Sequence, residues 1–337
     1  MNLKKIIEER IKERGLSYFS NLPFKEILKI KVKRFRQSLI STPYSDAQFI
    51  AEVTFKLKNN KEIQKKIFIK KFKNAEQEYN NFKKIKKITS GPLKMAPFYY
   101  DFLKEENLIF VEYIYPAKNL LYEFLKNNIV FHNIDYSKNL MRKIACWLTS
   151  FQSQFNLGEN KDFSYFLALT KKELTKIPYF SFSEKEKLIA IIKKEAIKIK
   201  KIPLVYSADL YLRHLLLYQD RLILVDWDNL KITHPYYDIH ALFINLESRT
   251  RHPFFFSLRY IKKLEDEFLK TYKAKSSFDF SEKIYKITRL MYLIHFLYSY
   301  YWRYRKKIFH PKKMIFWRFF IYNIKKEVKN YLIEDEF

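Results

Sequence analysis

Three polar side chains that could handle a proton or a metal ion stand around two short apolar runs in residues 204–238. The runs fall within residues 215–225 and are separated by a polar turn, which predicts a β-hairpin. Asp209 and His214 precede the first run, and Asp226 follows the second. Because the open ends of a hairpin lie side by side, we expect these three side chains to converge. Two carboxylates and an imidazole could then position a hydroxyl and hold a divalent cation.

A lysine and a glutamate nearer the N-terminus suit the same chemistry. Lys70 ends a strand-like run, and Glu78 follows eight residues later in a predicted helix. In phosphoryl transfer a lysine neutralises phosphate oxygens and a glutamate fixes that lysine, while an aspartate orients the acceptor hydroxyl and further ligands hold Mg²⁺. We therefore assign Lys70 and Glu78 to the nucleotide phosphates, Asp209 to the base, and His214 and Asp226 to the metal.

Each of these residues also has a plainer interpretation. Lys70 lies in a basic stretch, K-K-I-F-I-K-K, that suits a solvated face, and Asp226 could cap a turn. A single histidine before an apolar run, such as His214, is more often structural than a ligand. The spacing of these residues relative to one another favours the catalytic interpretation.

The elements that must position these residues change in type near residue 115. Strand-like runs and one amphipathic helix give way to long helical periodicities. The strand-like runs cover 27–36, 49–57, 67–69 and 107–114, and the helical segments cover 3–13, 75–88, 119–126, 136–155, 183–200, 237–247, 258–272, 282–306 and 313–333. This order predicts an α+β protein with an antiparallel-sheet N-terminal lobe, residues 1–115. A mainly helical C-terminal lobe, residues 116–337, contains the hairpin.

Several motifs resemble those of known kinases. Residues 108–114 (L-I-F-V-E-Y-I), the V-D-W-D of 225–228 and the P-Y-Y-D of 235–238 resemble the aminoglycoside phosphotransferase and choline kinase group. Residues 209–217 (D-L-Y-L-R-H-L-L-L) are more similar to the lipopolysaccharide core heptose kinases, which carry histidine where most kinases carry asparagine.

The resemblance implies a protein-kinase-like two-lobed fold and a reaction that uses ATP and Mg²⁺. It places Glu112 and Ile114 in a hinge strand at the nucleotide. It also gives His214 a precedent as a metal-site residue. Asp238 becomes a structural brace beneath the catalytic loop.

Two features depart from these families. Ser207 and its neighbours stand where they carry a histidine that braces the catalytic loop. Residues 37–47 link the first two predicted strands without a glycine, so the close backbone approach of a glycine-rich phosphate loop is lost. Serine and threonine hydroxyls in that segment could still meet phosphates. These departures keep open a pseudokinase that binds without transferring phosphate.

The charge of the chain bears on its acceptor. Lys and Arg total 65 against 36 Asp and Glu, a net charge of +29 that favours polyanionic partners. Our leading interpretation is an ATP-dependent kinase for a sugar hydroxyl on an anionic, lipid-linked glycan of the lipopolysaccharide core type. The alternatives are a small soluble acceptor, as in aminoglycoside and choline kinases, and the pseudokinase. No nucleic-acid recognition module is found, so we expect no such partner.

Cysteine content and hydropathy bear on location. The single cysteine excludes a disulfide framework, and the N-terminus lacks a signal-peptide core, so we expect a cytoplasmic protein. The longest uncharged run near the C-terminus, residues 290–302, is thirteen residues, short of the roughly 20 that span a bilayer. Aromatic and basic residues between 292 and 320 suit either helix-core packing or peripheral contact with an anionic inner-membrane surface.

Overall fold

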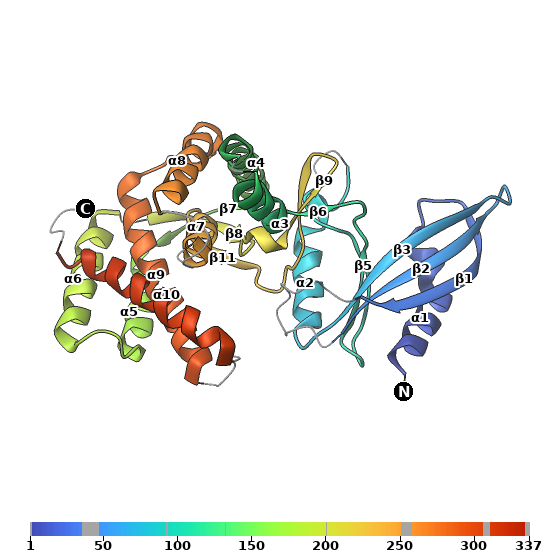
Figure 1. The fold of residues 1–337 in the computed structure, drawn as a ribbon, viewed down its shortest axis with the longest axis horizontal. Coiled ribbons are helices and arrows are strands. Elements are labelled where there is room, and N and C mark those ends of the chain that lie inside the picture. Colours follow the sequence, from blue (N-terminus) through green and yellow to red (C-terminus); the bar gives the residue numbers. More distant parts are fainter. Residues whose placement is uncertain are drawn as a thin grey trace. The chain divides into compact units, whose positions relative to one another are not determined.

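The structure is a computed structural model in which two compact units are distinguished. The described residues are 2–35, 47–91, 94–131, 133–199, 201–250, 258–305 and 311–333, with the side chains of 129–130, 248–250, 258, 303–305 and 311–320 left out. The first unit comprises Met1–Asn119 and His214–Asn229, and the second comprises Leu120–Arg213 and Leu230–Phe337 (Figure 1). The segment 36–46, which carries the hydroxyls predicted near the phosphates, lies outside the described residues.

The first unit is built on a five-stranded antiparallel sheet in the order β1-β2-β3-β5-β4. Its strands are β1 (Phe24–Arg34), β2 (Ala47–Leu57), β3 (Glu62–Lys71), β4 (Tyr99–Leu103) and β5 (Leu108–Glu112), and its helices are α1 (Leu3–Tyr18), α2 (Ala75–Ile85) and the 3-10 turn η1 (Lys86–Ile88). The four predicted strands and the helix after β3 are confirmed, whereas the short β4 was missed because it lacks an apolar run of its own.

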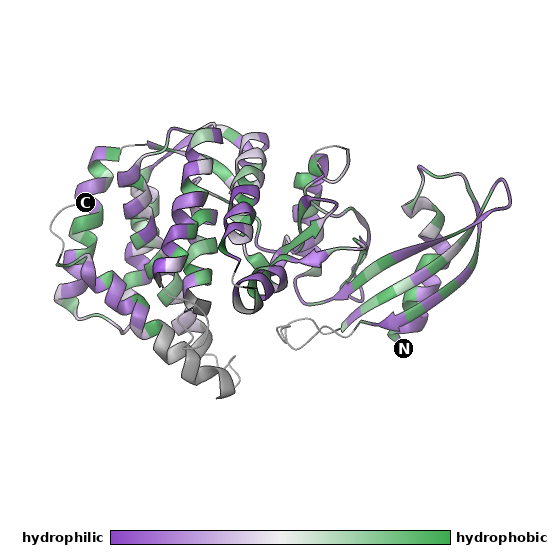
Figure 2. Cartoon of the chain, turned by 45° about the horizontal axis from the view of Figure 1, so that its top comes forward, coloured by the Kyte–Doolittle hydropathy of each residue, from purple (hydrophilic) through white to green (hydrophobic). Residues whose placement is uncertain are grey.

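The core of this sheet lies between β2 and α1. Phe49, Val53 and Phe55 alternate with half-buried neighbours along β2, and hydropathy alternates along the strands of this sheet (Figure 2). The first helix is longer than the predicted 3–13, since α1 continues through Gly15 to Tyr18. Gly15 packs closely against β1, because a Cβ there would lie 2.9 Å from Ile27 Cδ1 and would force that side chain to shift.

The predicted hairpin forms and belongs to the first unit. Strands β9 (Leu215–Tyr218) and β10 (Arg221–Leu224) pair antiparallel, and β9 also pairs with β6 (Lys118–Asn119). Both turn residues, 219 and 220, have positive φ, which matches the tight turns that close two-residue hairpins. The division predicted near residue 115 put this hairpin in the C-terminal lobe. Direct contacts with the N-terminal segment group it there instead, since Leu224 N donates to Met95 O at 2.8 Å and Asp226 pairs with Lys70.

The second unit is mainly helical, with one small antiparallel sheet in the order β11-β8-β7. Its helices are α3 (Leu120–Leu125), the π-helix η2 (Lys126–Val130), α4 (Ile134–Gln154), α5 (Phe163–Lys176), α6 (Phe182–Ile199), α7 (Tyr237–Thr250), α8 (Leu258–Lys275), α9 (Glu282–Arg305) and α10 (Pro311–Asn330), and its strands are β7 (Asn156–Asp162), β8 (Lys201–Ser207) and β11 (Lys231–Thr233). The 3-10 turn η3 (Leu212–His214) leads into β9. The helices predicted from periodicity are confirmed, and α5 is an addition.

A buried arginine joins four helices of the second unit. Arg289 on α9 reaches Glu247 on α7 at 2.7 Å, Glu265 on α8 at 3.3 Å and Glu327 on α10 at 3.0 Å. Each of the three guanidinium nitrogens donates to one carboxylate, which offsets the cost of placing this charge at 13% exposure.

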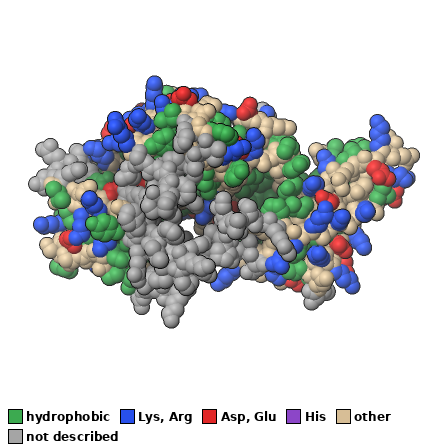
Figure 3. All heavy atoms as spheres, viewed as in Figure 1, with side chains coloured by type: hydrophobic (Ala, Val, Ile, Leu, Met, Phe, Trp, Pro, Cys, Tyr) green, Lys and Arg blue, Asp and Glu red, His purple; other side chains and the backbone are tan. Residues whose placement is uncertain are grey.

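Charge and hydropathy show no membrane-spanning element in the described residues. None of the helices there is long and apolar enough to cross a bilayer. Lysine and arginine side chains are scattered over many elements on the face drawn in Figure 3, rather than gathered in one area. The basic and aromatic side chains of 303–320, on which the predicted membrane contact depends, lie outside the described side chains.

Candidate active site

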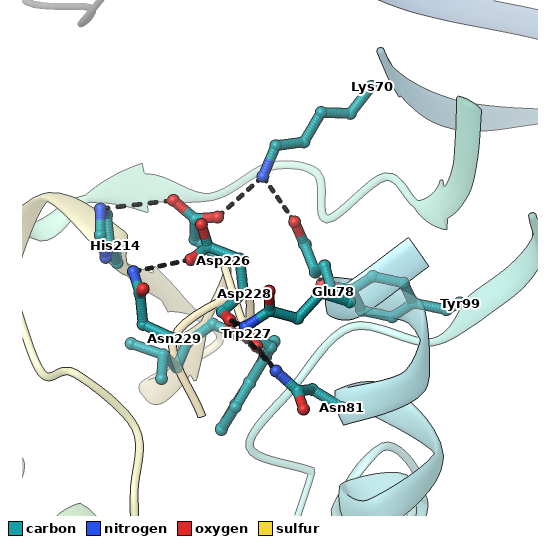
Figure 4. Close-up of polar contacts among 11 residues, drawn as sticks. Lys70, Glu78, Asn81, Tyr99, His214, Asp226, Trp227, Asp228 and Asn229 are labelled. Atoms are coloured by element: carbon teal, nitrogen blue, oxygen red, sulfur yellow. Dashed lines mark hydrogen bonds and ion pairs between the residues drawn. The ribbon is translucent and has the colours of Figure 1, made fainter. Parts of the chain in front are cut away.

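Lys70 is held between two carboxylates of the first unit. Its Nζ lies 2.8 Å from Glu78 Oε2 and 2.8 Å from Asp226 Oδ1 (Figure 4). Strand β3 delivers the lysine near its end, and α2 begins four residues later at Ala75, which turns Glu78 back toward it. Glu78 is only 2% exposed and also accepts a hydrogen bond from Tyr99 Oη at 2.5 Å. The predicted pairing of Lys70 with Glu78 is therefore present in the structure.

The electrostatics of this triad favour a charged lysine. Burial disfavours the ammonium, but the charges of Glu78 and Asp226 outweigh burial and raise the pKa of Lys70. Burial raises the pKa of Glu78, and the neighbouring ammonium opposes that rise. Lys70 is thus a mostly buried ammonium that two carboxylates hold in one position. A fixed cation of this kind suits a ligand rich in phosphate oxygens.

Asp226 lies next to His214, as the hairpin predicts. Their nearest polar atoms, His214 Nε2 and Asp226 Oδ2, are 3.5 Å apart. The backbone holds both in place, since Val225 N donates to His214 O at 2.8 Å. Asp226 has a φ of 89°, in the left-handed region that few side chains adopt, so its position is imposed by the surrounding structure.

Helix α2 also fixes the backbone after Asp226. Asn81 Nδ2 donates to Trp227 O at 2.8 Å, and Gln77 Nε2 donates to Asp228 O at 2.7 Å. Trp227 is fully buried. We did not predict Gln77 or Asn81 from the sequence. The only sequence feature that could have indicated this role is their four-residue spacing, which puts both side chains on one face of the helix.

His214 and Asp226, the two predicted metal residues, lie together in this unit. Within the described ranges, no three His, Cys, Asp or Glu side chains gather into a site built from protein alone. A nucleotide-bound Mg²⁺ needs only one or two protein ligands, because phosphate oxygens and water complete its shell. The carboxylate of Asp226 fits that requirement, and His214 adds a nitrogen beside it.

Glu112 and Ile114 lie at the end of β5. The carboxylate of Glu112 accepts hydrogen bonds from Lys94 Nζ and, at 3.0 Å, from Phe98 N. Ile114 is buried and lies two residues beyond the last strand residue. The Glu112 side chain thus binds residues that precede β4. Its backbone, rather than its side chain, would therefore contact the nucleotide. That role stays a prediction.

Asp209 belongs to the second unit, in a loop that Asp238 braces. Ser207 Oγ donates to Asp238 at 2.8 Å, and the Ala208 and Leu210 amides each donate to the same carboxylate at 3.1 Å. Ser207 Oγ in turn accepts from Asp209 N at 3.3 Å. Ser207, a departure from the resembled families, therefore takes part in bracing the loop.

A lysine near Asp209 was missed. Lys231 Nζ lies 2.6 Å from Tyr237 Oη and 3.9 Å from the centre of that ring. Burial lowers the pKa of Lys231, while the charges of Asp209 and Asp238 oppose that change. In sequence Lys231 is one of many lysines, so nothing marked it.

The buried carboxyl of Asp238 should make the free energy of unfolding depend on pH. Burial raises the pKa of Asp238 to about 6, although the hydrogen bonds from Ala208, Ser207 and Leu210 oppose that rise. A carboxyl whose pKa is raised on folding stabilises the fold at low pH and loses that contribution as pH rises through 6. The unfolding free energy of the wild type relative to Asp238→Asn should fall by about 2–3 kcal/mol between pH 4 and pH 7. Urea titrations of both proteins at four pH values measure this, and a pH-independent difference would contradict it.

The fold of this chain, an antiparallel sheet followed by a mainly helical unit, is similar to that of solved kinases. No protein-family model matches this sequence, and no curated protein sequence does. The structure is similar to the choline kinase of Streptococcus pneumoniae, with a TM-score of 0.55 and 18% identity over 96% of this chain and 98% of that one. The predicted α+β, protein-kinase-like fold is confirmed.

Two further neighbours have the same fold. A choline/ethanolamine kinase family protein of Mesorhizobium loti has a TM-score of 0.52 and 11% identity, over 82% of this chain and 84% of that one. An amicoumacin kinase in complex with AMP-PNP and Ca²⁺ has a TM-score of 0.51 and 11% identity, over 97% and 96%. At these identities the likeness is one of fold.

Proposed function

We propose that the protein is an ATP-dependent phosphotransferase with an alcohol group as acceptor. The observation that carries this proposal is the Lys70 ammonium, held 2.8 Å from both Glu78 and Asp226. A fixed, desolvated lysine beside a metal-binding carboxylate is what stabilises charge on transferring phosphoryl oxygens. The protein-kinase-like fold supports the proposal, and neighbours with that fold are solved with AMP or with AMP-PNP and Ca²⁺.

Each predicted site residue has a role in this proposal. Lys70, oriented by Glu78, contacts the phosphates of ATP, and the backbone at Glu112 and Ile114 meets the adenine edge. Asp209 accepts or orients the proton of the acceptor hydroxyl. A divalent cation would neutralise phosphate charge when bound. Asp226 and His214 would hold it.

Two observations bear on the acceptor, and each supports a different candidate. Structural neighbours include kinases named for choline and amicoumacin, which supports a small-molecule alcohol. The net charge of +29 supports a finer candidate, a sugar hydroxyl on an anionic, lipid-linked glycan. That acceptor would bring the protein to an anionic membrane surface as a peripheral partner.

A nucleotide titration tests the proposal. A non-hydrolysable ATP analogue with a divalent cation, at about 100 times its Kd, should stabilise the fold by about 2.7 kcal/mol and raise the melting temperature by several degrees. Asp226→Asn should reduce that shift because it removes a negative ligand. Asp220→Asn, at the exposed hairpin turn, is the matched control and should keep the full shift.

ADP release then identifies the acceptor. The panel should contain choline, an aminoglycoside and phosphorylated sugars, each assayed with ATP. Release that depends on an anionic sugar would favour the glycan, and release with a cationic amine would favour the choline-type acceptor. A protein that shows no thermal shift at millimolar nucleotide would instead be a pseudokinase binding module.

A further inference from the structure

We propose that the metal site of this protein selects Mn²⁺ over Mg²⁺, and that His214 sets this preference. The inference rests on the proposed function, since it concerns the metal that accompanies the nucleotide. It goes further by naming which ion the side chains present would choose.

The two donor atoms are fixed relative to each other by the hairpin. His214 directly precedes β9, and Asp226 follows β10 by two residues. The register pairs Leu215 with Leu224, and Val225 N donates to His214 O at 2.8 Å. His214 Nε2 and Asp226 Oδ2 therefore lie on the same side of the open hairpin end, 3.5 Å apart.

That separation suits two ligands of one ion. Donor atoms that each lie about 2.1 Å from a cation, at octahedral or tetrahedral angles, are about 3.0–3.4 Å apart. The observed 3.5 Å needs only a small adjustment. The other carboxylate oxygen, Asp226 Oδ1, bonds to Lys70 at 2.8 Å, so it is Oδ2 that stands on the imidazole side.

The donor types decide between ions. Mg²⁺ is a hard cation that takes oxygen ligands almost exclusively, so an imidazole nitrogen replaces a favourable ligand with a poor one. First-row transition ions accept imidazole as well as carboxylate. We expect phosphate oxygens and water to complete the coordination shell, because no third His, Cys, Asp or Glu joins the pair in the described part of the chain. Mn²⁺ combines tolerance of nitrogen with affinity for these oxygens.

Metal binding measured directly tests this inference. Mn²⁺ bound to the full chain with AMP-PCP is titrated by electron paramagnetic resonance and displaced with Mg²⁺. We use AMP-PCP because its bridging carbon brings no nitrogen to the metal. His214→Asn, which supplies an amide oxygen in place of the imidazole, should lower the preference for Mn²⁺ over Mg²⁺ by about tenfold. His295→Asn, a partly exposed histidine that contacts Glu173, is the matched control and should leave it unchanged.

The spectrum gives an independent readout. Pulsed resonance of the wild-type complex should show coupling of Mn²⁺ to a nitrogen nucleus, and His214→Asn should lose it. An unchanged metal preference in His214→Asn, with no nitrogen coupling in the wild type, would overturn the inference and leave the proposed kinase function standing. Failure of AMP-PCP to bind with either ion would overturn the proposed function itself.

Discussion

Asp209→Asn is expected to lower the turnover number by about 10²–10⁴-fold, because the carboxylate that receives or orients the acceptor proton is lost. The fold should survive the change. Asp209 has a φ of 51°, and asparagine is among the few residues that tolerate the left-handed region. The Asp209 amide would keep its contact with Ser207 Oγ, which does not involve the substituted side chain.

In Asp209→Asn the turnover number should therefore fall while the affinity for nucleotide is retained. We would measure ADP release with the best acceptor, together with the Kd for the ATP analogue. Asp220→Asn is a matched control, since it makes the same chemical change at another aspartate with positive φ, 62°. If Asp209→Asn kept full phosphotransfer, the assignment of the base would be wrong.

Lys70→Met is expected to lower the free energy of unfolding by about 3–5 kcal/mol, in addition to abolishing transfer. The reason is Glu78, which is 2% exposed and would lose its cation while keeping only the hydrogen bond from Tyr99. A buried carboxylate without a counter-charge is costly, so Glu78 would take up a proton instead. The loss of stability should consequently be smaller at pH 5 than at pH 8.

The neighbouring lysine provides the comparison. Lys71 pairs with Glu106 at 3.3 Å, and both side chains are more exposed than those of Lys70 and Glu78, at 27% and 31%. Lys71→Met should cost no more than about 1 kcal/mol. Urea unfolding of the two variants at both pH values measures the difference. If Lys70→Met and Lys71→Met lowered the free energy of unfolding equally, burial would not determine how much the Lys70–Glu78 ion pair contributes to stability.

The local parts of the candidate site could be predicted from sequence. Lys70 and Glu78 are joined by a strand end, a short link and a helix start, and each of these has a clear sequence signal. His214 and Asp226 converge because a two-residue turn closes the hairpin between them. In both cases the chain between the partners is short, so secondary structure alone brings them together.

The parts that depend on backbone contacts or packing could not be predicted. Gln77 and Asn81 bind carbonyl oxygens of residues 227 and 228, and a carbonyl is the same in every residue. Gly15 lies inside α1 and packs closely against Ile27, and that tertiary contact has no local signal in the sequence. The grouping of the hairpin with the N-terminal segment also depends on long-range contacts, such as those of Leu224 with Met95 and of Asp226 with Lys70, which no local pattern records.

The composition of the first unit has a consequence for how the chain folds during synthesis. Residues 214–229 complete that unit, and they follow ninety-four residues of the second unit, Leu120–Arg213. Lys70 and Asp226 are 156 positions apart, so the ion pair between them cannot form until the ribosome has released most of the chain. The five-stranded sheet is complete by residue 112, but the small sheet of β6, β9 and β10 must wait for its last two strands while the helices of the second unit are already emerging. A fragment that ends at residue 119 would lack both those strands and the carboxylate that faces Lys70.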